Sequence, residues 1–143
     1  MWNFLTNNLK KGENYIYTGN TEATLCALCK NHTDNTFHRY FKCGVNSHMW
    51  NLFTVKLYGS KFNPSTDFLY ASFAGYKSVN AAIFKTILWS IHKIYYNYFF
   101  YKHKNINFSS YALLIQNNLR DMLNATSRTH KDSEEIQQLI SKL

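Results

Sequence analysis

The chain places all three of its cysteines in one short stretch together with a histidine, Cys26-Ala27-Leu28-Cys29 … His38 … Cys43. The spacing of the four candidate ligands is C-x2-C-x8-H-x4-C. Two cysteines separated by two residues can reach one ion from a single turn, and three thiolates with one imidazole complete a tetrahedral zinc site. We therefore predict a zinc knuckle with one structural Zn²⁺ held by these four residues and no coordination position left open for catalysis.

The same cysteines admit two other interpretations. A redox-active Cys-x-x-Cys pair belongs in a thioredoxin-like βαβ setting, which the sequence around Cys26 and Cys29 does not show. Unrelated buried cysteines would rarely gather into one window with a histidine. Because residues 1–8 lack the pattern of a signal peptide, we expect an intracellular, reducing compartment, where clustered cysteines bind metal rather than form disulfides.

Two neighbouring histidines compete with His38 for the fourth ligand position. His32 follows Cys29 by only three residues, so binding one ion together with Cys26 and Cys29 would strain the turn. His48 lies one turn into the next expected helix and would require a different loop. We therefore expect His38 to be the ligand.

His38 and Cys43 cannot face one ion from the same regular α-helix. They are five residues apart, which separates them by about 140° around a helix of 3.6 residues per turn. The sequence therefore predicts a helical turn over residues 36–42 that breaks before Cys43, with Gly44 supplying the conformational freedom.

Apolar residues at helical spacing account for most of the remaining chain. Helices are expected over residues 2–10, 46–58, 79–104, 110–125 and 132–143. Their expected N-terminal caps are short polar side chains, namely Asn46 or Ser47, Ser78, Ser109 or Ser110, and Asp132 in a capping box with Glu135. Gly59 is expected to end the second helix, and Pro64 to keep its surroundings irregular.

The residues expected to face the core recur on one side of each helix. They are Met49, Trp50, Phe53 and Leu57, then Ile83, Ile87, Leu88, Ile91, Tyr95 and Tyr98, then Leu114, Ile115, Leu119, Met122 and Leu123, and finally Ile136, Leu139, Ile140 and Leu143. The predicted fold is mainly α, with a short N-terminal helix, the zinc knuckle, and three to four packed helices. Residues 1–59 are expected to form the knuckle with its flanking helices, and residues 60–143 a helical region with a loosely attached last helix, 132–143. The most apolar run, residues 81–101, contains too many polar residues to cross a membrane, so no membrane partner is expected.

The chain is strongly basic, and the excess positive charge lies in the part of the sequence that contains the knuckle. Sixteen Lys and Arg residues against eight Asp and Glu give a net charge of +8. Residues 1–110 carry twelve basic and four acidic side chains, whereas residues 111–143 carry four of each. A basic surface favours polyanions, meaning nucleic acid or an anionic membrane face. A merely solvated basic surface would give the same composition, so charge alone leaves both interpretations open.

Enzymatic activity is not expected. The predicted zinc site is coordinatively closed, and the few acidic residues do not gather as a two-metal nuclease or ribonuclease H site requires. A Tyr-x-Asp-Asp polymerase motif is absent from the sequence. We therefore expect neither catalysis nor a small-molecule substrate.

Aromatic residues surround the ligands in a more particular pattern. The chain reads Cys26-Ala27-Leu28-Cys29, then Phe37-His38-Arg39-Tyr40-Phe41-Lys42-Cys43, then Met49-Trp50, and later Ile87-Leu88-Trp89-Ser90-Ile91-His92-Lys93. Over about residues 1–105 this resembles the reverse transcriptase zinc-binding domain of non-LTR retrotransposons, with its Cys-Pro-Leu-Cys, Glu-His-Leu-Phe-Phe-x-Cys, Leu/Ile-Trp and Leu-Trp-x-Ile-Trp-Lys segments. Ala27, Phe37 and Gly44 depart from the family's usual proline, glutamate and proline, but none of these changes removes a ligand.

The resemblance implies a non-enzymatic module of a retroelement reverse transcriptase, or a truncated relic of one. Its implied partners are RNA or single-stranded DNA and the polymerase body of the parent protein. Lys30, Arg39 and Lys42 lie within the ligand frame and are expected to meet phosphates, while Tyr40 stacks on an unpaired base.

Other roles remain open for the same residues. Tyr40 and Phe41 can instead pack against Trp50 and Phe53, an interpretation that we favour for Phe41 and leave open for Tyr40. The alternative function is a zinc-stabilised helical protein-interaction domain without nucleic-acid binding, which the neutral, amphipathic region 109–143 supports.

Overall fold

The computed structural model describes residues 25–26, 28–35, 37–61, 78–101, 107–128 and 133–143. The expected helix over 2–10, the loop around Pro64 and the cap at Asp132 lie outside the described residues. The prediction of a mainly α fold is confirmed. The elements are η2 (His38–Lys42), α2 (Gly44–Tyr58), α4 (Ser78–Tyr101), α5 (Phe108–Ser127) and α6 (Ser133–Lys142).

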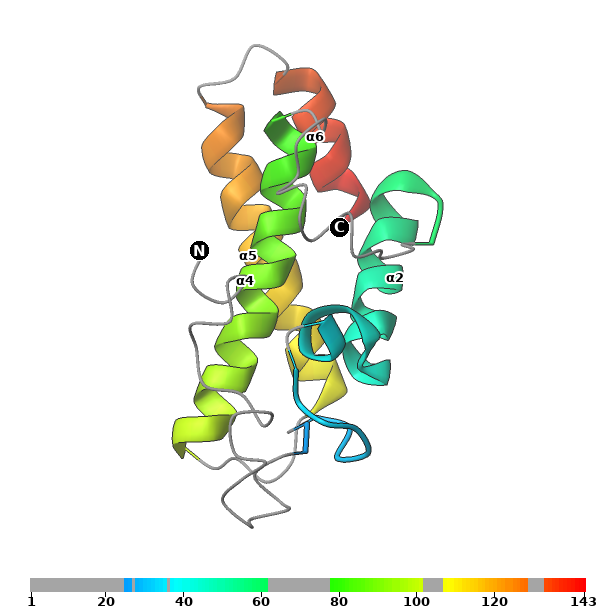
Figure 1. Ribbon diagram of the computed structural model, residues 1–143. Coiled ribbons are helices and arrows are strands. Elements are labelled where there is room, and N and C mark those ends of the chain that lie inside the picture. The colour runs from blue at the N-terminus through cyan, green and yellow to red at the C-terminus, as the bar shows by residue number, and fades with distance from the viewer. Residues whose placement is uncertain (1–24, 27, 36, 62–77, 102–106, 129–132) are drawn as a thin grey trace.

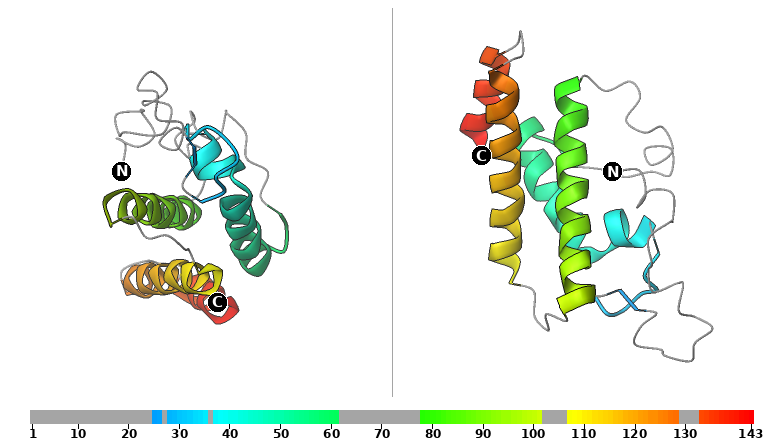
Figure 2. Two further views of the ribbon diagram at one scale, coloured as in Figure 1. Left: turned by 90° about the horizontal axis from the view of Figure 1, so that it is seen from below. Right: turned by 90° about the vertical axis from the view of Figure 1, so that its left-hand side faces the viewer.

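The two longest helices, α4 and α5, run side by side in opposite directions (Figure 1). α6 turns back from the end of α5 and packs along it, η2 lies on the side of α4 away from α5, and α2 runs beside the α4–α5 pair, where it also contacts α6 (Figure 2). η2 contacts both α2 and α4. The stretch with the four candidate ligands is therefore held against the start of α2 and the side of α4. Among the described helices none is long and apolar enough to cross a lipid bilayer.

α2 begins earlier than expected, because its first residue is Gly44 and its N-cap is Cys43. The prediction of a cap at Asn46 or Ser47 is wrong: both residues lie inside the helix, and the Asn46 side chain is buried. The end of α2 is confirmed at Gly59, whose φ of 78° is the left-handed conformation that glycine adopts easily. Its N–H donates to the Val55 carbonyl at 2.9 Å.

α5 is capped by Asn107, and the prediction of Ser109 or Ser110 as the cap is wrong. The Asn107 side-chain oxygen accepts hydrogen bonds from the backbone N–H groups of both serines, at 2.9 and 3.3 Å. An asparagine satisfies the first free N–H groups of a helix as well as a serine does, so the sequence offered three candidate caps within four residues. α5 consequently starts at Phe108 and gains two residues at its N-terminus.

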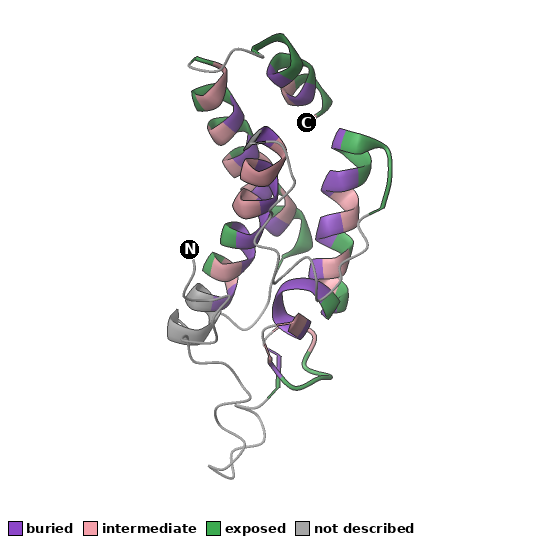
Figure 3. Cartoon of the chain, turned by 45° about the horizontal axis from the view of Figure 1, so that its top comes forward, coloured by how far each residue is buried: buried purple, intermediate pink, exposed green. Residues whose placement is uncertain are grey.

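The buried residues of the described helices belong to one hydrophobic core (Figure 3 colours them purple). The apolar stripe of α2 is buried as predicted, and so are five of the six residues named on α4, Ile83, Ile87, Leu88, Ile91 and Tyr95. The side chain of Tyr98 lies outside the described part. On α5 the buried residues are Tyr111, Ile115, Leu119 and Leu123, whereas Leu114 and Met122 are half-buried. α6 contributes Ile136 and Leu139 fully, with Ile140 and Leu143 at the edge of the core.

Candidate metal centre

The first two cysteines sit on a tight turn. An isolated antiparallel bridge pairs Leu25 with Thr33, and the Cys26 N–H donates to the His32 carbonyl at 2.8 Å. Within this loop the Lys30 N–H donates to the Cys26 carbonyl at 2.9 Å. Lys30 has a positive φ of 58°, which lets the chain reverse directly after Cys29. Both sulfurs consequently lie on the same side of the turn.

The third and fourth ligand positions come from a π-helical turn rather than an α-helical one. The N–H of Cys43 donates to the carbonyl of His38 at 2.7 Å, a bond between residues five apart. A π turn stacks residue i above residue i+5, which an α-helix cannot do. The Asn35 side-chain oxygen supports the start of the turn by accepting from the His38 N–H at 2.8 Å.

The chain does change direction at Cys43, whose φ and ψ are −54° and 131°. The prediction that Gly44 supplies the freedom is wrong, because Gly44 is the first helical residue of α2 and its φ is not positive. The expected separation of about 140° between His38 and Cys43 applies to an α-helix, whereas this turn is π-helical. A wider turn and an extended cysteine together bring His38 and Cys43 into one site.

Cys26, Cys29, His38 and Cys43 offer ligand atoms that all lie within 4.8 Å of one another. The Cys26 and Cys43 sulfurs are 3.8 Å apart, and the Cys29 sulfur is 3.3 Å from His38 Nε2. Metal–sulfur bonds of about 2.3 Å at tetrahedral angles place two sulfurs about 3.8 Å apart. The side chains present therefore fit a tetrahedral metal ion, with Cys26 and Cys43 already at the required separation.

The environment of the two buried sulfurs favours a thiolate at Cys43. The Cys26 thiol donates to the Cys43 sulfur, and the first backbone N–H groups of α2, at Val45 and Asn46, point at it as well. Together they outweigh burial and lower the pKa of Cys43 to about 7. Cys26 has a raised pKa, because its proton is shared with Cys43 and because it is buried. The pair thus consists of a protonated Cys26 and an ionised Cys43. A bound metal cation would displace the Cys26 proton and leave two thiolates.

His38 is suited to binding a metal in its neutral form. Burial lowers its pKa, and the neighbouring His32 ring, 5.1 Å away between centroids, lowers it further. His32 itself is exposed, and His48 faces away from the sulfurs to contact Phe108. The structure thus gathers His38 with the cysteines, as expected, and leaves the two competing histidines outside the cluster.

The expected nucleic-acid contacts divide into two groups. Lys30 and Lys42 are exposed beside the cluster. Arg39 and Tyr40 are only 5% and 0% exposed, so the expectation that they reach a ligand on the surface is wrong. A buried carboxylate explains the position of Arg39: its guanidinium forms an ion pair with Asp34, which raises the Arg39 pKa against the opposing effect of burial.

Tyr40 and Phe41 pack inward, and this resolves the interpretation left open for Tyr40. The Trp50 indole donates to the Tyr40 carbonyl at 2.7 Å, and Phe41 stacks on the Trp50 ring with centroids 5.8 Å apart. The tyrosine hydroxyl lies 3.2 Å from Nδ1 of His92 on α4. The aromatic residues around His38 therefore fasten the knuckle to α2 and α4.

Sequence reasoning missed four polar residues around the cluster, Asp34, Asn46, Tyr95 and Tyr111. Two of them carried a signal. Asp34 is the sole acidic residue between Glu22 and Asp67, five positions before an arginine. Asn46 lies three residues before Met49 on the apolar stripe of α2, where a polar side chain needs a buried partner. The hydroxyls of Tyr95 and Tyr111 carried no such signal.

No protein-family model, no curated protein and no solved structure matches this chain.

Proposed function

We propose that this chain is a non-enzymatic, zinc-stabilised domain that binds RNA or single-stranded DNA, as an accessory module of the reverse transcriptase type. The observation that carries the proposal is the closed cluster of three cysteines and one histidine within 4.8 Å. Three sulfurs and one imidazole nitrogen are the donor set that zinc prefers in structural sites.

Zinc in this site would serve the fold rather than a reaction. Cys26, Cys29, His38 and Cys43 would occupy all four positions of a tetrahedral ion and leave none for substrate. The ion would join the turn after Leu25 to the π turn before α2. In small zinc domains this binding contributes on the order of 10 kcal/mol to folding.

The nucleic-acid part of the proposal rests on charge and on the surface beside the cluster. The chain carries a net charge of +8. Lys30, directly after Cys29, and Lys42, the last residue of the π turn, are both exposed. The Lys42 ammonium lies 5.6 Å from the centre of the half-buried Phe37 ring. A cation beside a partly accessible aromatic ring suits a phosphate with its neighbouring unpaired base. Phe37 thereby replaces Tyr40 as the proposed stacking residue.

Metal analysis of the purified chain tests the first half of the proposal. We expect one zinc per chain and three cysteine thiols protected from alkylation until a chelator is added. On chelation the amide hydrogens of the knuckle should exchange rapidly, while most of the helical signal persists. Less than stoichiometric zinc after zinc-supplemented expression would contradict the proposed site.

Binding to a single-stranded oligonucleotide tests the second half. The double variant Lys30→Gln/Lys42→Gln should weaken binding and reduce the slope of log affinity against log salt by about 1 for each phosphate that the protein no longer neutralises. The matched control is Lys56→Gln/Lys61→Gln, which removes two exposed charges near the other end of α2. α2 has 15 residues and is therefore about 22 Å long, with Lys42 just before its start and Lys56 and Lys61 at or just beyond its end. Equal losses from both pairs, or no binding by the wild type, would contradict a nucleic-acid surface at the knuckle.

One observation favours the alternative function of a protein-interaction domain. Leu113 on α5 is 54% exposed, within the neutral, amphipathic region 109–143 that this alternative function would use. The same oligonucleotide assay separates the alternatives, because a protein-interaction domain would show weak binding that both lysine pairs affect alike.

A further inference from the structure

We propose that Tyr95 of α4 is a positioning residue for the metal: its hydroxyl donates a hydrogen bond to the Cys26 thiolate and joins the metal centre to the helical core. This inference rests on the proposed zinc site. It adds a residue from a distant helix whose removal should weaken metal binding without removing a ligand.

The contact itself is direct and buried. The Tyr95 oxygen lies 2.9 Å from the Cys26 sulfur, and both side chains are almost inaccessible to solvent. Tyr95 reaches the cluster from α4, 69 positions further along the chain. The Arg39 guanidinium covers the Tyr95 ring at 4.5 Å from its centre and holds the ring in place.

Neighbouring groups settle the direction of this hydrogen bond. The Asn46 side-chain amide donates to the Tyr95 oxygen at 3.3 Å. The tyrosine oxygen therefore already serves as an acceptor, and its own proton can point toward the sulfur. When Cys26 is a metal-bound thiolate it has no proton to give, so the hydroxyl must be the donor.

Asn46 is in turn held by two further partners. Its side-chain oxygen accepts from the Tyr111 hydroxyl of α5 at 2.6 Å, and its amide also donates to the Arg39 carbonyl. A buried chain of hydrogen bonds therefore runs from Cys26 through Tyr95 and Asn46 to Tyr111. It connects the knuckle with α4, α2 and α5, and it explains why a polar residue sits on the apolar stripe of α2.

The hydrogen bonds to the sulfurs stabilise the net negative charge that the proposed zinc site would carry. A divalent ion with three thiolates and a neutral imidazole has an excess negative charge that burial penalises. Hydrogen-bond donors aimed at the sulfurs spread that charge. At Cys43 the backbone N–H groups at the start of α2 do this, and at Cys26 the Cys29 backbone N–H and the Tyr95 hydroxyl do it. Partners of this outer kind typically change metal affinity 10- to 100-fold when removed.

The test compares Tyr95→Phe with Tyr58→Phe in the full chain. Tyr58 is a matched control, because its hydroxyl also joins α2 to α4, at 2.8 Å from the Asn80 side chain, but lies outside the cluster. Zinc affinity is measured by competition with a chelator. Co²⁺ replaces zinc as a spectroscopic probe whose thiolate-to-metal charge-transfer band reports electron density on sulfur.

We expect Tyr95→Phe to bind one zinc with an affinity reduced about 10- to 100-fold. Its cobalt charge-transfer band should move to lower energy, because the sulfur loses a hydrogen bond, and Tyr58→Phe should resemble the wild type in both measurements. Wild-type affinity and an unchanged band in Tyr95→Phe would overturn this inference and leave the zinc site standing. Failure of the wild type to bind zinc would overturn both.

A second variant decides the matter if Tyr95→Phe does not fold. Incorporating 3-fluorotyrosine at position 95 keeps the ring and the hydroxyl but makes the hydroxyl a stronger donor. We expect the cobalt charge-transfer band of this variant to move to higher energy. An unchanged band would show that the hydroxyl does not donate to the sulfur.

Discussion

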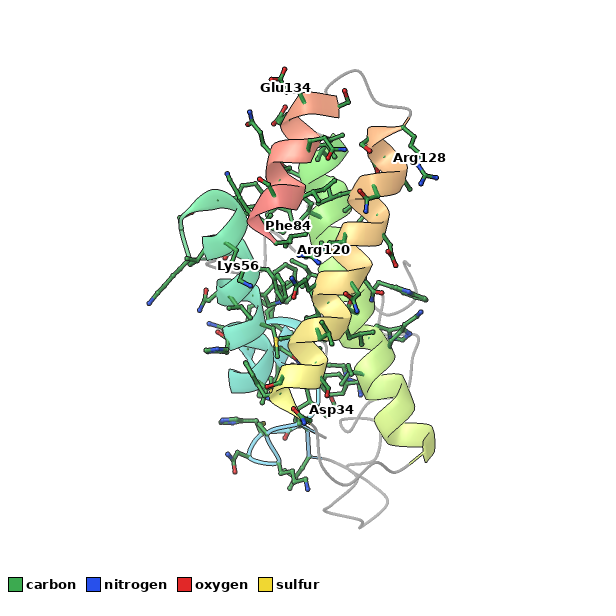
Figure 4. All side chains as sticks on the ribbon, turned by 180° about the vertical axis from the view of Figure 1, so that it is seen from behind. Asp34, Lys56, Phe84, Arg120, Arg128 and Glu134 are labelled. Atoms are coloured by element: carbon green, nitrogen blue, oxygen red, sulfur yellow. The ribbon has the colours of Figure 1, made fainter. Side chains whose placement is uncertain are left out.

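The knuckle, residues 25–43, and the helical pair α4 and α5 are held together in different ways. Apolar side chains spaced along both helices fill the space between α4 and α5, among them Ile87, Ile91, Ile115 and Leu119. The knuckle has little regular structure, and its described parts are joined by four candidate ligands, a buried ion pair and a few backbone hydrogen bonds. Asp34 of the knuckle and Glu134 of α6 lie toward opposite ends of the described structure (Figure 4).

This difference predicts how the stability of each region should respond to single substitutions. Apolar packing is distributed over many side chains, so the loss of one leaves the rest in place. A metal centre concentrates its stabilisation in four atoms, and losing one of them removes most of it. The two regions should therefore fail separately, except where buried polar groups and the aromatic side chains of Tyr40 and Phe41 connect them.

The largest effect is expected from Cys29→Ser. This variant removes a thiolate and with it most of a binding free energy on the order of 10 kcal/mol. Zinc stoichiometry should drop, and amide hydrogens of the knuckle should exchange rapidly while those of α4 and α5 stay protected. His32→Ala, which alters an exposed histidine outside the cluster, should retain one zinc. Full stoichiometry and stability in Cys29→Ser would refute the ligand assignment.

Asp34→Asn should produce the next largest effect. It leaves the buried Arg39 guanidinium without its counterion, and breaking such a pair typically costs about 3–5 kcal/mol. Urea unfolding of the zinc-loaded protein measures the change. Asp121→Asn, at an exposed position on α5, serves as the control and should stay within about 0.5 kcal/mol of the wild type. A similarly small change for Asp34→Asn would mean that Arg39 finds solvent or another partner.

Ile115→Ala should destabilise the helical region without affecting the metal. The Ile115 side chain of α5 is fully buried in the core, and truncating a buried isoleucine costs about 2–5 kcal/mol. The neighbouring Leu113→Ala, at an exposed position, should cost no more than about 0.5 kcal/mol. Zinc affinity should be unchanged in both variants. A loss of affinity in Ile115→Ala would show that the core and the knuckle unfold as one unit.

The smallest effect is a pH dependence that originates at His92. Burial lowers the pKa of His92, and the charge of Arg39 lowers it further. Because the folded pKa lies below the unfolded value of about 6.5, folding favours the neutral ring. Its contribution is then present above that pH and is lost as the pH falls through the folded pKa. His92→Gln should therefore reduce the slope of unfolding free energy against pH between about 7 and 5, and His48→Gln, at an exposed position of α2, is the control. An identical slope in His92→Gln would refute the assignment.

Much of the fold followed from local patterns in the sequence. The apolar stripe of α2 and the buried positions of α4 are set by a spacing of three and four residues, which helical geometry translates directly into one face. Gly59 ends α2 because the required backbone angle is local too. The four candidate ligands were identifiable for a similar reason, since their residue types and spacing within 18 positions limit the chemistry that they share.

The tertiary structure decided which polar residues became part of the interior. Arg39 and Lys42 are both cationic and lie three residues apart in the sequence, yet Arg39 is buried on Asp34 while Lys42 stays exposed. Asn46 is of a residue type that caps helices, yet its partners Tyr95 and Tyr111 lie 49 and 65 positions away. Such partners become visible only when helices distant in sequence pack together, because hydrogen bonding depends on distance in space and leaves no period in the chain. Local patterns in the sequence identified the candidate ligands and the helices, whereas the burial of Arg39 and the hydrogen bonds from Tyr95, Asn46 and Tyr111 around the sulfurs depend on how segments distant in sequence pack together.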